Sequence, residues 1–220
     1  MKNKLLAFCA IIILLQSAKT NAQSFPAFAK EIFTFKMQDS VNNPPKNAIL
    51  FVGSSSFARW KDIADYFPGY AIINRGFGGS GLIDVIRYAY DIIIPYQPKQ
   101  VIIYVGDNDL AGGVTVQDVM TRFKTLFQII RTNLPNTTID YVSIKPSPLR
   151  EQLMPKMKEA NIQIQEFLKT QNNTGFIDIF SLMLTENGKP KSEIFIEDRL
   201  HINAQGYAIW KQVILPYLKK

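Results

Sequence analysis

Short apolar runs alternate with longer amphipathic segments along most of the chain. Several of the runs are apolar throughout, as expected of strands that are covered on both faces of a sheet. Turn-forming residues bound each run, so the runs are short enough to be strands. The predicted strands of a five-stranded parallel sheet lie at 48–52, 70–74, 100–105, 138–144 and 175–179.

Helical periodicity fills most of the intervals between these strands. In the clearest case apolar residues recur at spacings of three and four, Thr115 stands where an N-cap is needed, and Asp118 lies in the first turn. Pro155 and Asn203 mark two further helix starts, and Pro216 marks a helix end. Strands that alternate with helices in this way predict an α/β fold with helices on both faces of the sheet. The predicted helices span 82–90, 116–134, 153–168 and 204–215.

The first residues have the layout of a secretory signal peptide. Lys2 and Lys4 precede an apolar run over 5–15, and small residues ending at Ala22 supply a cleavage site. A transmembrane anchor is the alternative, but the run is well short of the roughly 20 apolar residues that cross a bilayer. We expect residues 1–22 to be removed on export to the periplasm or the medium, which leaves no membrane span in the mature chain.

Composition then narrows the chemistry available to the mature chain. Cys9 lies in the leader, so the mature chain has no cysteine for a disulfide, a thiol nucleophile or a metal site. The formal charge of +7 falls by three with the leader, and the remaining Lys and Arg residues are scattered, which argues against a nucleic-acid partner. Residues 23–46 form a polar lead-in with a short helical pattern at 28–35, and 47–220 are expected to form one domain.

Residues with chemical potential follow the predicted strands directly. In a parallel sheet, ligands bind beyond the carboxyl ends of the strands, so these residues are expected to converge at one edge. A fourth polar group, at 198–201, precedes the last helix. The four groups read Gly53-Ser54-Ser55-Ser56, Asn74-Arg75-Gly76-Phe77-Gly78-Gly79-Ser80, Gly106-Asp107-Asn108-Asp109 and Asp198-Arg199-Leu200-His201.

Together these residue types supply the parts needed for acyl transfer to a serine. A serine hydroxyl needs a base to accept its proton, and His201 is the only histidine of the chain. Asp198 is the nearest carboxylate that could orient the imidazole. A main-chain N–H of Gly79 or its neighbours and the amide of Asn108 are suited to stabilise an oxyanion. Each group also has a purely structural interpretation: His201 could cap the final helix, and Asn108 could be a turn residue, with Asp109 beside it as a local cap.

The four groups resemble blocks I, II, III and V of the SGNH or GDSL-like hydrolase family over roughly residues 47–218. The resemblance implies a flavodoxin-like three-layer α/β/α fold and a Ser-His-Asp mechanism with Ser55, His201 and Asp198. It also implies an oxyanion hole made by the N–H groups of Ser55 and Gly79 and the Asn108 amide. Two departures exist: Ser54 and Ser80 stand where the family often has Asp, and Ser54 and Ser56 leave hydroxyls on both sides of Ser55.

Three other interpretations compete with this one. Gly76, Gly78 and Gly81 satisfy the G-x-G-x-x-G pattern of dinucleotide-binding proteins, although the next candidate acid lies farther along than expected. The same fold could also serve as a non-catalytic glycan- or peptide-binding module. A metal hydrolase is disfavoured because one histidine and no mature cysteine leave few ligands.

We therefore expect an esterase that needs no cofactor or metal and acts on short acyl, above all acetyl, esters of a sugar, lipid or small molecule. Little of the mature chain is left over to form a lid domain, which favours short acyl groups. Arg59 and Trp60 follow the nucleophile closely and could line its pocket, but Trp60 is better explained as a core residue on a helix.

Overall fold

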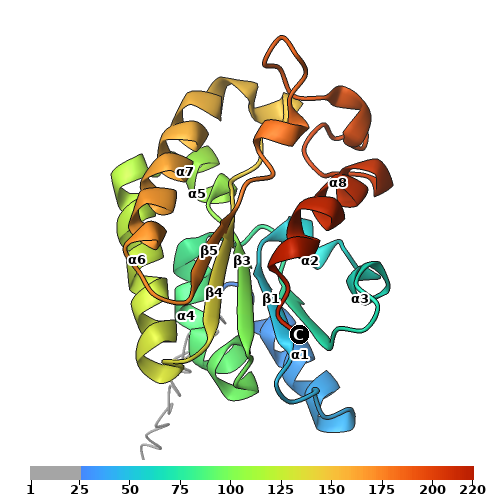
Figure 1. The fold of residues 1–220 in the computed structure, drawn as a ribbon, viewed down its shortest axis with the longest axis vertical. Coiled ribbons are helices and arrows are strands. Elements are labelled where there is room, and N and C mark those ends of the chain that lie inside the picture. The colour runs from blue at the N-terminus through green and yellow to red at the C-terminus, as the bar shows by residue number, and fades with distance from the viewer. Residues whose placement is uncertain (1–25) are drawn as a thin grey trace, which may run out of the picture.

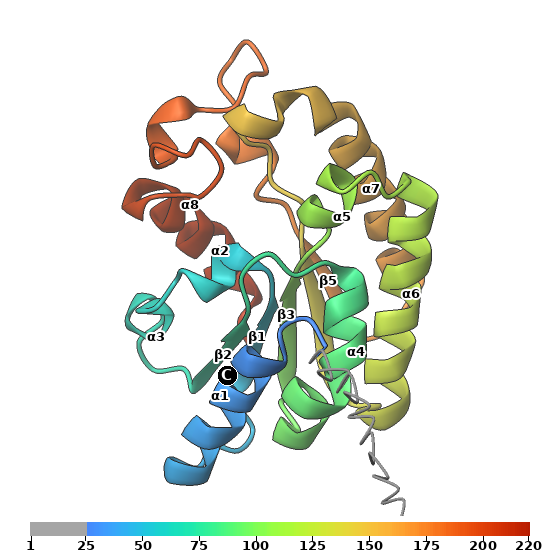
Figure 2. The same ribbon diagram turned by 180° about the vertical axis from the view of Figure 1, so that it is seen from behind.

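The computed structural model describes residues 26–220, and within them five strands form one parallel sheet between two layers of helices (Figures 1 and 2). The strand order is β2-β1-β3-β4-β5, and each neighbouring pair is parallel. This arrangement confirms the predicted α/β class and the parallel sheet. The strands are β1 (Ile49–Gly53), β2 (Ile72–Gly76), β3 (Gln100–Tyr104), β4 (Thr138–Val142) and β5 (Thr174–Ile177).

Helices cover both faces of the sheet. Helices α4, α6 and α7 lie together on one face, while α3 and α8 lie on the other (Figure 1). The helices are α1 (Ala29–Val41), α2 (Ser55–Ala58), α3 (Ile63–Tyr66), α4 (Leu82–Ile92), α5 (Asp107–Ala111), α6 (Val116–Asn133), α7 (Met154–Lys169) and α8 (Ala204–Ile214). Among the described residues, no helix combines the length and the apolar character needed to cross a membrane.

The predicted helix ends are set by side chains and by proline. The Thr115 hydroxyl accepts a hydrogen bond from the Asp118 N–H at the start of α6, and Asn203 accepts from two N–H groups at the start of α8. Pro155 lies in the first turn of α7. Pro216 does not end helical structure abruptly, because a 3₁₀ turn over Leu215–Tyr217 follows α8.

Strand boundaries differ from the predicted ones by one or two residues. Strand β4 ends at Val142, although the apolar run continues to Ile144. The reason is that the N–H and C=O of Ile144 bond to the side chain of Asn161 on α7, at 2.8 and 3.0 Å, and not to a neighbouring strand. An apolar run can thus extend beyond the end of its strand when a side-chain amide bonds to the backbone N–H and C=O groups in place of a neighbouring strand.

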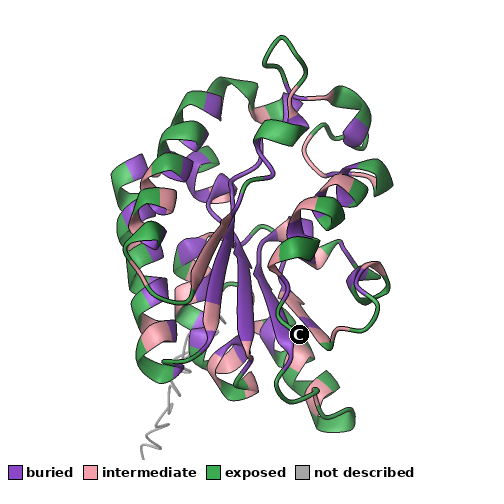
Figure 3. Cartoon of the chain, in the orientation of Figure 1, coloured by how far each residue is buried: buried purple, intermediate pink, exposed green. Residues whose placement is uncertain are grey.

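The core is divided by the sheet, whose central strands are buried on both faces (Figure 3). Leu50 and Val52 of β1 face the layer of α4, α6 and α7. Ile49 and Phe51 face the opposite layer, where Trp210 of α8 is fully buried. This double burial explains why β1 lacks the polar alternation of a half-exposed strand.

The lead-in is more ordered than its sequence indicates. A helical pattern was expected only at 28–35, but α1 extends to Val41. Asp39 near its end pairs with Arg75 of β2, and the Arg75 guanidinium lies 5.1 Å from the Phe35 ring centroid. These long-range contacts extend the helix beyond what local periodicity predicts. The proposed leader, residues 1–22, lies outside the described residues.

Candidate active site

The topology brings the ends of β1 and β3 to one crevice. The chain leaves β1 for β2 on one side and then continues through β3 on the other side of β1, so the connections diverge at their carboxyl ends. Such a switch point is where open α/β sheets bind ligands. Ser55 follows β1 and Asn108 follows β3, so two predicted site residues flank this point.

A sharp turn places Ser55 at the first position of α2. Gly53 ends β1 with φ of +137°, and a Cβ atom there would lie 1.9 Å from the Tyr104 carbonyl oxygen. Only glycine tolerates both the dihedral and the close approach of β3. The strand consequently turns at once into α2, which places the half-buried Ser55 at the sheet edge.

Two side chains hold α2 from outside the helix. The Asn74 amide donates to the carbonyl oxygens of Phe57 at 2.8 Å and of Trp60 at 3.1 Å. The Tyr207 hydroxyl of α8 donates to the Ser56 carbonyl at 2.8 Å. These bonds satisfy carbonyls at the end of a four-residue helix that is too short to be stable alone.

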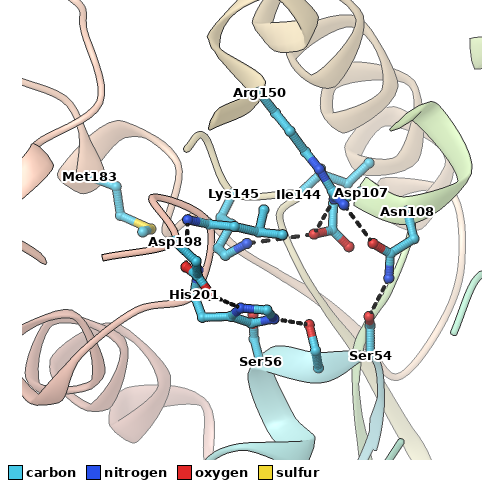
Figure 4. A network of polar contacts seen from close by, with 12 residues as sticks. Ser54, Ser56, Asp107, Asn108, Ile144, Lys145, Arg150, Met183, Asp198 and His201 are labelled. Carbon is cyan, nitrogen blue, oxygen red and sulfur yellow. Dashed lines mark hydrogen bonds and ion pairs between the residues drawn. The ribbon is translucent and has the colours of Figure 1, made fainter. Parts of the chain in front are cut away.

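The only imidazole lies between a hydroxyl and a carboxylate. His201 Nε2 is 3.0 Å from Ser55 Oγ. On the other side of the ring, His201 Nδ1 is 2.6 Å from Asp198 Oδ2 (Figure 4). The other Asp198 oxygen accepts from the backbone N–H groups of Leu200 and His201, each at 2.9 Å. Partial burial opposes the ionised form, but the hydrogen bonds from His201 and Leu200 outweigh it and lower the pKa of Asp198 to about 2.

The hydroxyls beside Ser55 have other surroundings. Ser54 is fully buried, and its Oγ accepts a hydrogen bond from the Asn108 amide at 2.7 Å. Ser56 Oγ is also buried and has no hydrogen-bond partner within residues 26–220. Ser55 is thus the serine of this turn whose hydroxyl contacts His201.

The three hydrogen-bond donors of the predicted oxyanion hole differ in whether they already have a partner. No described residue accepts a hydrogen bond from the backbone N–H of Ser55 or of Gly79. Gly79 has φ of +82°, and nothing lies within 4 Å of the position of a Cβ, so the dihedral alone favours glycine. The third donor, the Asn108 amide, bonds to Ser54 Oγ and, at 3.0 Å, to the Ser80 carbonyl.

Sequence reasoning missed two cations behind Asn108. Arg150 donates to Asn108 Oδ1 at 2.9 Å and to Asp107 Oδ2 at 3.0 Å (Figure 4). The Lys145 ammonium is 3.5 Å from the same Asp107 oxygen. Burial lowers the pKa of Lys145, and the charge of Asp107 opposes this shift. A signal was available, because both cations lie in the segment that directly follows β4 at the same sheet edge.

Asp109 has a structural position. Its Oδ2 accepts from the Leu82 N–H at 2.9 Å, and Asp84 Oδ2 accepts from the Gly81 N–H at 3.0 Å. Asp109 therefore caps α4 and not its own helix. A bound pyrophosphate would need these same N–H groups, so the start of α4 is unsuited to the dinucleotide interpretation.

Trp60 and Arg59, which follow Ser55 closely in the sequence, have different surroundings. Trp60 is fully buried and stacks on Tyr207 at 4.6 Å between ring centroids, which confirms it as a core residue, although it follows α2 and does not lie within it. Arg59 is exposed. Within the described part of the chain, no group of three or more His, Cys, Asp or Glu residues is arranged to hold a metal ion.

Comparisons with known proteins identify the family and the fold of the chain. The model of the GDSL-like Lipase/Acylhydrolase family matches residues 45–209. No curated protein matches the chain by sequence. Several solved structures under 25% identical to the chain share its fold.

A Streptococcus pneumonia protein described as a platelet activating factor is 21% identical, with a TM-score of 0.76 over 86% of this chain and 92% of its own. A GDSL-like lipase from Bacteroides thetaiotaomicron is 19% identical, with a TM-score of 0.73 over 84% of this chain and 96% of its own. An acetylxylan esterase from Geobacillus stearothermophilus is 14% identical, with a TM-score of 0.63 over 77% and 93%.

Proposed function

Because the chain belongs to the GDSL-like lipase/acylhydrolase family, and is therefore a serine ester hydrolase, we propose that Ser55, His201 and Asp198 carry out its reaction on short acyl esters. The observation that carries this proposal is the 3.0 Å contact between His201 Nε2 and Ser55 Oγ. Nucleophile, base and orienting carboxylate are the three parts that acyl transfer to serine requires.

In the proposed reaction, Ser55 Oγ attacks the ester carbonyl carbon while its proton passes to His201 Nε2. The tetrahedral intermediate collapses, the carbon–oxygen bond to the alcohol breaks, and His201 returns the proton to the departing alkoxide. Water then attacks the acyl-enzyme by the same route and releases the carboxylic acid. Asp198 keeps the Nδ1 proton directed at its own carboxylate and stabilises the imidazolium.

We assign stabilisation of the intermediate to the N–H groups of Ser55 and Gly79 and to the Asn108 amide. The two main-chain donors are free of protein acceptors in the described residues. The Asn108 amide would shift one hydrogen from Ser54 Oγ to the developing oxyanion. Removal of one such donor typically lowers kcat by about 10²–10³.

We propose acetyl and similarly short acyl groups as the substrates. Ser54, which precedes Ser55, is hydrogen-bonded to Asn108, and Asn108 is hydrogen-bonded in turn to Arg150 and to the carbonyl of Ser80. Asn108 and Arg150 are partly exposed, and a long alkyl chain that covered them would remove their water without offering hydrogen bonds in return, which costs free energy. The acetylxylan esterase with a similar fold is consistent with an acetylated sugar as one such ester.

Hydrolysis of p-nitrophenyl esters from acetate to octanoate tests the acyl preference. We expect kcat/KM to fall steeply beyond butyrate, because added methylenes would cover the partly exposed Asn108 and Arg150 without forming hydrogen bonds to them. The control is the chain-length dependence of spontaneous hydrolysis under the same conditions. A preference for octanoate would contradict the short-acyl proposal.

We also propose that the protein is exported and that its leader is removed before Gln23. The support is the pattern of basic, apolar and small residues in the first 22 positions. N-terminal sequencing of the protein recovered from the periplasm or the medium should begin at Gln23. Retention of residues 1–22 on a membrane-bound protein would instead favour an uncleaved anchor.

A further inference from the structure

An amide that serves an oxyanion hole must have the correct end turned toward the substrate. The nitrogen of an asparagine side chain donates hydrogen bonds, whereas its oxygen only accepts them. A half-turn of the amide would therefore place a partially negative oxygen against the oxyanion. Because the two orientations have nearly the same shape, neighbouring polar groups must decide between them.

The neighbours of Asn108 decide this orientation without ambiguity. Arg150 has only donors, so the atom it contacts at 2.9 Å has to be Asn108 Oδ1. The Ser80 carbonyl has only acceptor capacity, so the atom 3.0 Å from it has to be Asn108 Nδ2. A reversed amide would lose both bonds, because its nitrogen would face the Arg150 donors and its oxygen would face the Ser80 carbonyl oxygen.

Arg150 is itself fixed by a buried carboxylate. One guanidinium nitrogen bonds to Asn108 and another bonds to Asp107, the preceding residue on the same helix. The exposed fractions of the two side chains are 14% for Arg150 and 3% for Asp107. Lys145, whose side chain is 2% exposed, adds a second cation on Asp107. A planar guanidinium holds two acceptors at a fixed angle on two separate nitrogens, whereas the donors of an ammonium group share one nitrogen and rotate.

From these contacts we infer that Arg150 is a positioning residue for ester hydrolysis, which holds the Asn108 amide with its N–H groups toward the oxyanion while Asp107 holds Arg150. This inference rests on the proposed function, since it requires Asn108 to be an oxyanion donor. The side-chain hydrogen bonds of Arg150 go to Asp107 and Asn108 and not to Ser55 or His201, so its effect is transmitted through the amide.

The test is a double-mutant cycle that measures kcat and KM for p-nitrophenyl acetate. Asn108→Ala should lower kcat by about 10²–10³, as expected for loss of an oxyanion donor. Arg150→Met should lower kcat by roughly tenfold or more while KM changes by less than about twofold, because ground-state binding does not use the oxyanion contact. The double variant should lose about as much as Asn108→Ala alone, since Arg150 has no amide left to orient.

Arg122→Met is the matched control for a structural effect. Arg122 pairs with Asp109 at 2.8 Å, so this variant also removes a guanidinium from a buried carboxylate next to Asn108. Arg122 is not hydrogen-bonded to the Asn108 amide. We expect Arg122→Met to lower thermal stability about as much as Arg150→Met does, while its kcat stays within about threefold of the wild type. Arg150→Lys should restore stability but not kcat, because a single ammonium nitrogen does not reproduce the two coplanar guanidinium nitrogens that bond separately to Asp107 and Asn108.

Each outcome separates the inference from the function on which it rests. Unchanged kcat in Asn108→Ala would refute the oxyanion role and with it this inference. A loss in Asn108→Ala with none in Arg150→Met would overturn the inference and leave the oxyanion role intact. Losses that multiply in the double variant, or equal losses in Arg122→Met, would show that Arg150 acts by its own charge or through stability.

Discussion

Ser55→Ala should lower kcat for p-nitrophenyl acetate by about 10⁶, to the rate left by binding and the remaining hydrogen-bond donors. The alanine variant keeps the helix start and the Gly53 turn, so its folding should be unaffected. What it loses is the oxygen 3.0 Å from His201 Nε2. Without it no acyl-enzyme can form. The measurement combines steady-state kinetics with mass spectrometry after exposure to a fluorophosphonate, which should label the wild type once and the variant not at all.

Ser54→Ala and Ser56→Ala are the controls for this substitution. Ser54 Oγ serves as an acceptor for the Asn108 amide, and its loss frees an N–H that the oxyanion can use. Ser56 Oγ has no partner in the described structure. Both variants should therefore keep most of the activity. Loss of hydrolysis confined to one of these neighbours would show that the nucleophile has been assigned to the wrong serine.

The fold could be predicted because its signals are local. Strands buried on both faces have continuous apolar sequences, and side chains such as Thr115 and Asn203 mark where helices begin. Element ends were less predictable wherever a distant partner replaced the backbone ladder. Asn161 ends β4 before its apolar run does, and Arg75 lengthens α1. Neither contact can be predicted from the local periodicity of apolar residues.

The candidate site divides in the same way. Ser55, Asn108 and Gly79 could be predicted because they follow strands whose ends must meet at one edge. His201 could be predicted because it is the only histidine in the sequence. Arg150 and Lys145 also follow a strand, yet cations usually indicate solvated surface. Their burial depends on Asp107, which lies about forty residues earlier in the chain. Only the three-dimensional arrangement shows that these charges compensate one another.

That compensation affects how the site can evolve or be altered. Asp107 is nearly inaccessible to water and pairs with two cations, so removal of one cation leaves it paired with the other. Loss of Asp107 would instead leave two cations facing each other with no anion between them, which is far more costly. Substitutions at Arg150 are therefore better suited than substitutions at Asp107 to separate positioning from stability.

His201→Ala should lower kcat by about as much as Ser55→Ala, roughly 10⁶, because nucleophile and base act as one unit. No second histidine exists in the chain to take over the proton. The Ser55 hydroxyl remains in this variant, but within residues 26–220 no side chain other than His201 is hydrogen-bonded to it and able to accept its proton during attack. Steady-state kinetics on p-nitrophenyl acetate measures the loss. A His201→Ala variant that retains more than a small percentage of kcat would exclude His201 as the base.

The pH profile of the wild type provides the independent check on this assignment. Asp198 has its pKa lowered to about 2 by hydrogen bonds that outweigh the opposing effect of burial, so it stays ionised throughout the range from pH 4 to 9. An acid limb in that range must then come from another group, and the base is active only when the imidazole is neutral. We expect kcat/KM to rise with pH through a single ionisation with a slope of one, and Asp198→Asn to lower the plateau by about 10⁴. A wild-type profile that stays flat down to pH 4 would mean that no histidine has to lose a proton before Ser55 attacks.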